Sequence, residues 1–271
     1  MRAKAVCAIL AVCSAGLPAA PALAAPQPVK AAVLRSQGTQ FTIGTWQYLN
    51  STWPQFGNTP VQIDYWSLAA YHWTYDKIAA TGANVLILSC PGYNMYFPEE
   101  IEAVRQYVEA GHGLIITYGN FRSEDRALAP LVGLSTLNIL GTGTAIDPIQ
   151  IEPLAPDHAL FRGLAGPYVS GTRYLASPWS WWRDPWILDG GSTLATIPAL
   201  AMPPGPEVAI VANEGERYRG VYFSYYIETG NQQDMQVLYN AILWAPEPGT
   251  ACLMIVGAAW LLRRGPAGRR R

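Results

Sequence analysis

The chain has 271 residues, of which 50% are hydrophobic and 14% charged, and its formal net charge is −1. Its two ends hold seven of the 18 basic residues and one of the 19 acidic residues, so residues 25–245 carry about −7. A phosphate backbone demands a basic patch, and this acidic body therefore argues against nucleic acid as a partner. Cys90 is its single cysteine, which excludes a disulfide within it.

The first 24 residues have the pattern of a secretory signal peptide. Arg2 and Lys4 precede an apolar stretch at residues 5–17, and Ala22-Leu23-Ala24 is a small-x-small cleavage site. A lipoprotein-type site at Cys13 is the alternative, although the valine before it is unfavourable. We expect the mature chain to begin at residue 25.

Residues 29–133 alternate short β-rich runs with longer helical patterns, as parallel α/β sheets do. The expected strands are residues 31–35, 61–66, 84–89 and 113–118, and the expected helices are residues 42–56, 74–81 and 97–111. Thr74 is the expected N-cap of the second helix. In the third helix, Ile101, Val104, Tyr107 and Val108 share one face, which predicts that this face is buried.

After residue 133 the pattern becomes less regular. We expect an extended excursion at 141–156, a short turn or helix at 157–163, and irregular hairpins over the end of the sheet at 174–206, a stretch rich in Trp, Pro and Gly. Paired strands at 208–212 and 220–226 and a helix at 232–244 would close the body. The predicted fold is α/β: a flavodoxin-like parallel sheet flanked by helices, with a Trp-rich irregular β excursion and an antiparallel C-terminal pair.

Several segments together resemble a known superfamily. Residues 83–93 read ANVLILSCPGY, residues 97–120 read FPEEIEAVRQYVEAGHGLIITYGN, residues 158–164 read HALFRGL, and a closing strand and helix span 221–244. The set resembles the class I glutamine amidotransferase-like superfamily, in particular its trehalose-utilisation-type branch, over about residues 31–244. Active amidotransferases carry a cysteine after the later strand and a downstream His-x-Glu pair. Here Thr117 stands at the nucleophile position and no such pair follows, so we expect no glutamine hydrolysis.

One alternative is a cysteine-dependent hydrolase. Cys90 ends the strand at 84–89, and the turn at Pro91-Gly92 could expose it and help to hold an oxyanion. Its thiolate would need His112 or His158 as a base. The competing interpretation makes Cys90 a small buried residue at a strand end. The scattered histidines lack the spacing of metal ligands, so we expect no metal and no cofactor.

Aromatic residues suggest a second kind of site, for saccharide. Tryptophans clustered within residues 179–186 could stack on sugar rings, or could pack in a core under a long loop. Other polar and aromatic residues follow the parallel strands, at the edge where open α/β sheets bind ligands. The ligand-binding candidates are Tyr93, Tyr96, Tyr118, Asn120, Trp179, Trp181, Trp182, Arg183 and Trp186.

The C-terminal 26 residues have the features of a sorting tail. Pro246-Glu247-Pro248 is followed by an apolar run at 250–262 and by five arginines. This arrangement resembles the PEP-CTERM sorting signal, which implies export, retention in the inner membrane and later cleavage by an exosortase-type enzyme. The apolar run is short for a bilayer core, which takes about 20 helical residues. An ordinary C-terminal helix is the alternative.

These observations predict three parts: a signal peptide (1–24), an amidotransferase-like domain (25–245) and a PEP-CTERM-like tail (246–271). The expected function is that of an exported, non-catalytic binding module, held in the inner membrane and then placed at the cell surface or in the matrix. Its partners would be an exosortase-type enzyme and an exopolysaccharide or another envelope glycan. The alternatives are the Cys90 hydrolase and a purely structural envelope protein.

Overall fold

The computed structural model describes residues 26–35, 43–65, 73–89, 97–117, 125–134, 142–145, 148–172, 174–177, 191–202 and 205–246. The predicted signal peptide lies outside these ranges, and so does the predicted tail apart from Pro246.

A nine-stranded sheet forms the centre of the molecule, in the order β2-β1-β3-β4-β11-β10-β9-β6-β7. Its first five strands are parallel: β2 (Val61–Asp64), β1 (Val29–Arg35), β3 (Val85–Ser89), β4 (Gly113–Thr117) and β11 (Arg219–Phe223). In chain order these five strands give 2-1-3-4-5, the order of flavodoxin-like sheets. The predicted fold class is confirmed.

The other half of the sheet is antiparallel. It consists of β10 (Gly205–Glu214), β9 (Ser192–Met202), β6 (Ile149–Pro153) and β7 (Tyr168–Ser170), while β5 (Thr142–Ala145) pairs separately with β8 (Tyr174–Ser177). The sequence predicts irregular hairpins over the end of the sheet at residues 174–206. The β9–β10 pairing is irregular, with register shifts, but β9 extends the main sheet sideways, because both of its edges find strand partners.

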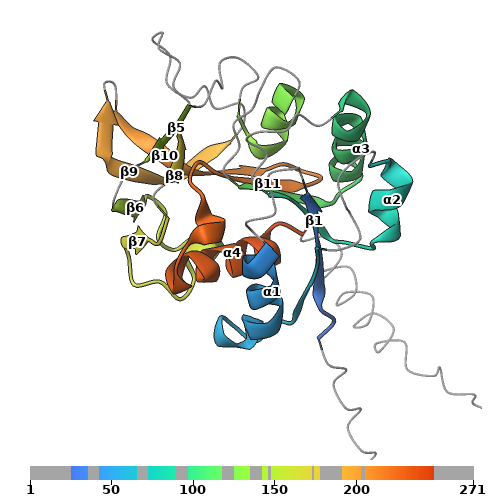
Figure 1. The fold of residues 1–271 in the computed structure, drawn as a ribbon, viewed down its shortest axis with the longest axis horizontal. Helices are drawn as coiled ribbons and strands as arrows, with labels where there is room; N and C mark the ends of the chain where they lie inside the picture. Colours follow the sequence, from blue (N-terminus) through green and yellow to red (C-terminus); the bar gives the residue numbers. More distant parts are fainter. Residues whose placement is uncertain are drawn as a thin grey trace, which may run out of the picture.

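Helices cover both faces of the parallel half (Figure 1). One face carries α1 (Ile43–Thr52), with the short η2 (Trp53–Gln55) after it, and α4 (Gln232–Trp244). The other face carries α2 (Tyr75–Ala80), α3 (Pro98–Glu109) and η3 (Asp125–Val132). The remaining single turns are η4 (Ala159–Phe161) and η5 (Ile227–Thr229). Thr74 caps α2 as predicted, since its side chain accepts from the Lys77 amide.

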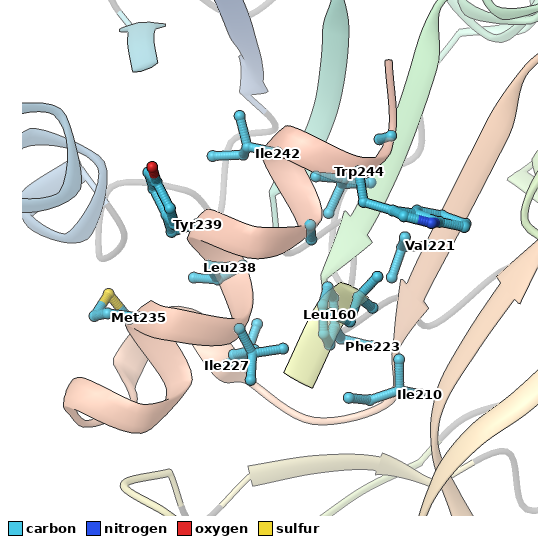
Figure 2. Close-up of a cluster of buried hydrophobic side chains, with 14 of the residues drawn as sticks. Leu160, Ile210, Val221, Phe223, Ile227, Met235, Leu238, Tyr239, Ile242 and Trp244 are labelled. Atoms are coloured by element: carbon cyan, nitrogen blue, oxygen red, sulfur yellow. The ribbon is translucent and has the colours of Figure 1, made fainter. Parts of the chain in front are cut away.

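Alternating side chains of each strand divide the core into two layers. Ile87 and Ile115 pack toward α1 and α4, whereas Leu86 and Ile116 pack toward α2 and α3. Figure 2 shows α4 closing the first layer over the end of β11. Because both faces of β3 and β4 are covered, every residue of these two strands is buried.

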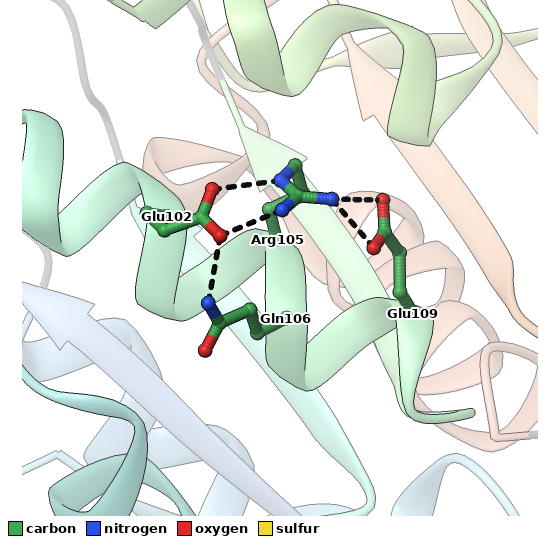
Figure 3. Close-up of polar contacts among 4 residues, drawn as sticks. All are labelled: Glu102, Arg105, Gln106 and Glu109. Atoms are coloured by element: carbon green, nitrogen blue, oxygen red, sulfur yellow. Dashed lines mark hydrogen bonds and ion pairs between the residues drawn. The ribbon is translucent and has the colours of Figure 1, made fainter.

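The ends and the outer face of α3 follow from its sequence. Glu100 accepts hydrogen bonds from the Phe97 and Trp73 amides, both at 3.0 Å, which fixes the start of the helix. On the solvent side, Arg105 pairs with Glu102 and Glu109, each at 2.6 Å (Figure 3). These exposed pairs mark the solvated face of a helix rather than a binding site.

Gly220 in β11 is required by a close approach to η3. A Cβ atom there would lie 2.2 Å from the carbonyl oxygen of Leu131. We expect Gly220→Ala to lower the free energy of unfolding by about 1–3 kcal/mol, because backbone must move to admit the methyl group. The matched control is Gly44→Ala in α1, where an added Cβ meets nothing within 4 Å. It should stabilise by up to about 1 kcal/mol in urea unfolding, and equal effects of the two changes would contradict the packing argument.

Candidate ligand site at the carboxyl edge of the parallel sheet

The carboxyl ends of the parallel strands line one edge of the sheet, and the strand order reverses between β1 and β3. Open α/β sheets bind ligands at this place. Ser89, the last residue of β3, pairs on one side with Arg35 of β1 and on the other with Thr117 of β4. The fold therefore places the Ser89 and Thr117 hydroxyl groups next to each other at this edge.

Both hydroxyl groups lie on the sheet face that α1 and α4 cover. Ser89 lies two residues after Ile87, and Thr117 two residues after Ile115, so each shares the sheet face of an isoleucine that belongs to that layer. Neither Ser89 nor Thr117 is exposed. From α1, the Trp46 indole Nε1–H donates to Ser89 Oγ over 3.4 Å. The indole thus orients the hydroxyl from the helix side.

Glu228, in η5 just beyond β11, completes the group. Its side chain is 1% exposed, and its Oε1 accepts a hydrogen bond from the Ser89 hydroxyl. The hydroxyl of Thr45 donates to the backbone carbonyl of Glu228, which fixes η5 against α1. Oε2 has no hydrogen-bond partner among the described residues. Trp46, Ser89, Thr117 and Glu228 are called the Glu228 cluster below.

The electrostatics of the Glu228 cluster favour an uncharged acid. Burial raises the pKa of Glu228 from 4.5 to about 8, and the hydroxyls of Ser89 and Thr117 offset only part of that rise. The carboxyl is therefore protonated at neutral pH. A protonated carboxyl has a hydrogen to donate, and Oε1 is already occupied as an acceptor.

A second buried acid, Asp234, has a structural explanation. Its Oδ2 accepts from the Ser170 hydroxyl and from the amides of Gly171 and Asn231, at 2.8–3.0 Å. These contacts join β7 to the first turn of α4. Burial raises the pKa of Asp234 to about 6, against the lowering effect of its three donors. Asp234 caps a helix, and we do not count it as part of the ligand site.

The two described histidines lie at the opposite edge of the sheet. His112 immediately precedes β4 and stacks on Tyr107 at 3.9 Å between ring centroids. His158 caps η4, and its ring contacts Trp244 at the end of α4, with Nε2 3.4 Å from Glu214. Neither histidine is at the edge where β3 ends. Among the described residues, the structure thus provides no histidine base for a nucleophile at that edge.

Most of the sequence-predicted site residues lie outside the described ranges. These are Cys90, Tyr93, Tyr96, Tyr118, Asn120, Trp179, Trp181, Trp182, Arg183 and Trp186, together with Glu247 and Pro248 of the tail. Within the described segments, no helix is both long and apolar enough to cross a bilayer. The same segments contain no group of three or more His, Cys, Asp or Glu side chains placed to hold a metal ion.

Sequence reasoning missed Glu228 and its contact with Ser89. The sequence has no downstream His-x-Glu pair, yet residues 226–228 read Tyr-Ile-Glu shortly after the final parallel strand. An acid at that position, with tyrosine in place of histidine, was the signal that could have pointed to the site. The contact itself joins residues far apart in the chain.

Known structures share this architecture. A ThuA-like protein from Bacteroides uniformis aligns with a TM-score of 0.50 and 15% identity, covering 84% of this chain and 94% of that one. A ThuA-like protein from Parabacteroides merdae aligns with a TM-score of 0.56 and 12% identity, covering 81% of this chain and 90% of that one. A cytoplasmic protein from Salmonella typhimurium aligns with a TM-score of 0.51 and 14% identity, covering 81% of this chain and 99% of that one. No family model matches the sequence, and no relative is found among curated proteins.

These likenesses define the class of fold. It is a mixed α/β fold with a large, mostly parallel sheet flanked by helices. Two of the structural neighbours are ThuA-like proteins, in keeping with the fold that the sequence resemblance implied. At these identities, the similarity establishes the fold alone.

Proposed function

We propose that this protein is an exported, surface- or matrix-associated binding module that holds saccharide, without hydrolysing it, at the carboxyl edge of its parallel sheet. The observation that carries the proposal is the Glu228 cluster. It gathers a carboxyl group with an unpartnered oxygen, two hydroxyl groups and an indole at the switch point of the sheet.

The chemistry of the cluster suits binding better than nucleophilic catalysis. A thiol or hydroxyl nucleophile needs a base that is free to take its proton. Glu228 is protonated at neutral pH, and both described histidines lie at the other edge. The cluster can therefore exchange hydrogen bonds with a ligand but has no ready proton acceptor.

Saccharide is the ligand class that fits these groups. Sugar hydroxyls both donate and accept hydrogen bonds, which matches a set of serine, threonine and carboxyl oxygens. The tryptophan-rich stretch at 179–186 supplies further aromatic side chains in the sequence. The proposed export rests on the signal-like residues 1–24. The proposed retention and exosortase processing rest on the PEP-CTERM-like residues 246–271, whose resemblance also implies an association with exopolysaccharide.

A carbohydrate-binding screen tests the proposal. We expect the full-length chain, purified in detergent, to bind members of an immobilised panel of bacterial exopolysaccharides and to release no reducing ends from them. Thr117→Val, which removes one hydroxyl group of the cluster, should weaken binding by roughly 5–30-fold, the loss of one buried hydrogen bond. Thr59→Val is the matched control, because Thr59 precedes β2 at the opposite edge. No binding at all, or equal loss in both variants, would overturn the proposed function.

A further inference from the structure

We propose that Glu228 contacts the ligand directly and in its protonated form, donating a hydrogen bond from Oε2 to an uncharged oxygen, such as a hydroxyl or ring oxygen of a sugar. This inference rests on the proposed function and adds which group binds the ligand, in which protonation state, and to which kind of atom.

The direction of the hydrogen bonds supports it. Trp46 Nε1–H donates to Ser89 Oγ, and the Ser89 hydroxyl donates in turn to Glu228 Oε1. Because Trp46 and Ser89 each use their hydrogen to donate to the next group, Glu228 Oε1 acts as an acceptor. The carboxyl proton is therefore on Oε2, which has no partner in hydrogen-bond geometry among the described residues, although Glu228 is 1% exposed and the Thr117 hydroxyl is near enough to lower its pKa. A buried donor without a partner is costly, and a ligand oxygen would satisfy it.

The surroundings of Glu228 maintain the neutral form. The strands β3 and β4 face it with the uncharged Ser89 and Thr117. The buried titratable side chains on this face of the sheet are Tyr225 and Tyr168, whose pKa values burial raises well above 10, Tyr239, whose pKa burial also raises, and the acid Asp234. The titratable residue of α1 is Tyr48, which is 43% exposed. None of these side chains carries a positive charge that would favour the ionised form of Glu228. Arg35 pairs with Ser89 through the backbone, and its effect on the pKa of Glu228 can be tested by substitution.

A neutral donor makes ligand binding depend on pH in a defined direction. While the carboxyl is protonated, affinity should be constant. Above its pKa of about 8 the carboxylate can no longer donate, so affinity should fall by up to roughly tenfold per pH unit. Glutamine at this position keeps an acceptor for Ser89 and places an amide N–H where the acid O–H was.

The experiment measures the affinity of the full-length chain for the tightest exopolysaccharide of the panel between about pH 6 and about pH 10, by calorimetry. We expect wild-type affinity to fall above about pH 8, Glu228→Gln to bind with no such fall, and Glu228→Leu to lose at least roughly tenfold at every pH. A fall that persists in Glu228→Gln, or wild-type affinity in Glu228→Leu, would overturn the inference and leave the proposed function standing.

A second readout needs no ligand. The carboxyl carbon of Glu228, labelled with ¹³C and assigned by its absence in Glu228→Gln, should report a protonated acid at pH 7 by NMR. An ionised signal there overturns the inference even if no glycan binds. Arg35→Gln should leave the titration unchanged. If the pKa of Glu228 rose strongly in Arg35→Gln, Arg35 would be favouring the ionised form of Glu228 in the wild type, and this result would also contradict the inference.

Discussion

Replacing Glu228 by glutamine is expected to stabilise the protein by roughly 2–4 kcal/mol at pH 8 and to change its stability little at pH 4. Below pH 4.5 the carboxyl is protonated in both the folded and the unfolded chain. As the pH rises toward 8, only the unfolded chain releases the proton, so the free energy of unfolding falls by up to about 1.4 kcal/mol per pH unit. Above about 8 the folded state ionises too and the loss ends. Urea denaturation of both proteins over this pH range measures the difference.

Asp234→Asn provides the matched control for this pH dependence. Asp234 is also a buried acid, but its pKa is raised only from 3.8 to about 6. By the same reasoning, Asp234 affects the pH dependence of the free energy of unfolding only below about pH 6. The fall in this free energy between pH 6 and 8 should therefore remain in Asp234→Asn. If that fall survives in Glu228→Gln and disappears in Asp234→Asn, the assignment of the buried proton to Glu228 is wrong.

Phe223→Ala should lower the free energy of unfolding by about 3–5 kcal/mol. Phe223 is fully buried at the end of β11, where it packs in the layer beneath α4 (Figure 2). Its ring meets the Tyr225 ring edge to face, with 6.0 Å between the centroids. The change removes a ring from a closed layer and leaves a cavity that the strand and helix cannot both move to fill. Equilibrium urea unfolding at pH 6 gives the difference.

Leu154→Ala is the comparison for this substitution. Leu154 is 56% exposed just after β6, so the same kind of truncation should change stability by no more than about 0.5 kcal/mol. A small effect of Phe223→Ala, or a comparable loss at Leu154, would show that α4 does not close the core as described.

The parallel half of the fold could be predicted because its signals are local. The helix expected at 232–244 is found as Gln232–Trp244, where a 3.6-residue periodicity follows an asparagine cap. β3 was recognisable as an apolar run bounded by turn residues. β9 was not, because its sequence STLATIPALAM contains a proline and no alternation of apolar and polar residues. Its place in the sheet depends on partners in β6 and β10, which a local pattern does not reveal.

The candidate site could be predicted in its location but not in its chemistry. Strand ends define the carboxyl edge, and Thr117 lies at this edge as the last residue of β4. The role of Glu228 depends on its burial and on a hydrogen bond to Ser89, 139 residues earlier in the chain. Those properties arise only when β3, β11 and α1 pack together. His112 and His158, the candidate bases, show a related limit: sequence separation does not reveal which edge of the sheet a residue occupies.

Both ends of the described body leave from the edge opposite the Glu228 cluster. Val29 starts β1 there, and the Ala245 carbonyl lies so close to Gly113, at the start of β4, that a Cβ on this glycine would be 2.5 Å from it. Arg219 holds the same corner by donating to the Trp244 carbonyl over 3.1 Å. A tether joined at residue 246 would therefore attach the body at the edge opposite the Glu228 cluster. The carboxyl edge would then lie on the side of the body away from the attachment point.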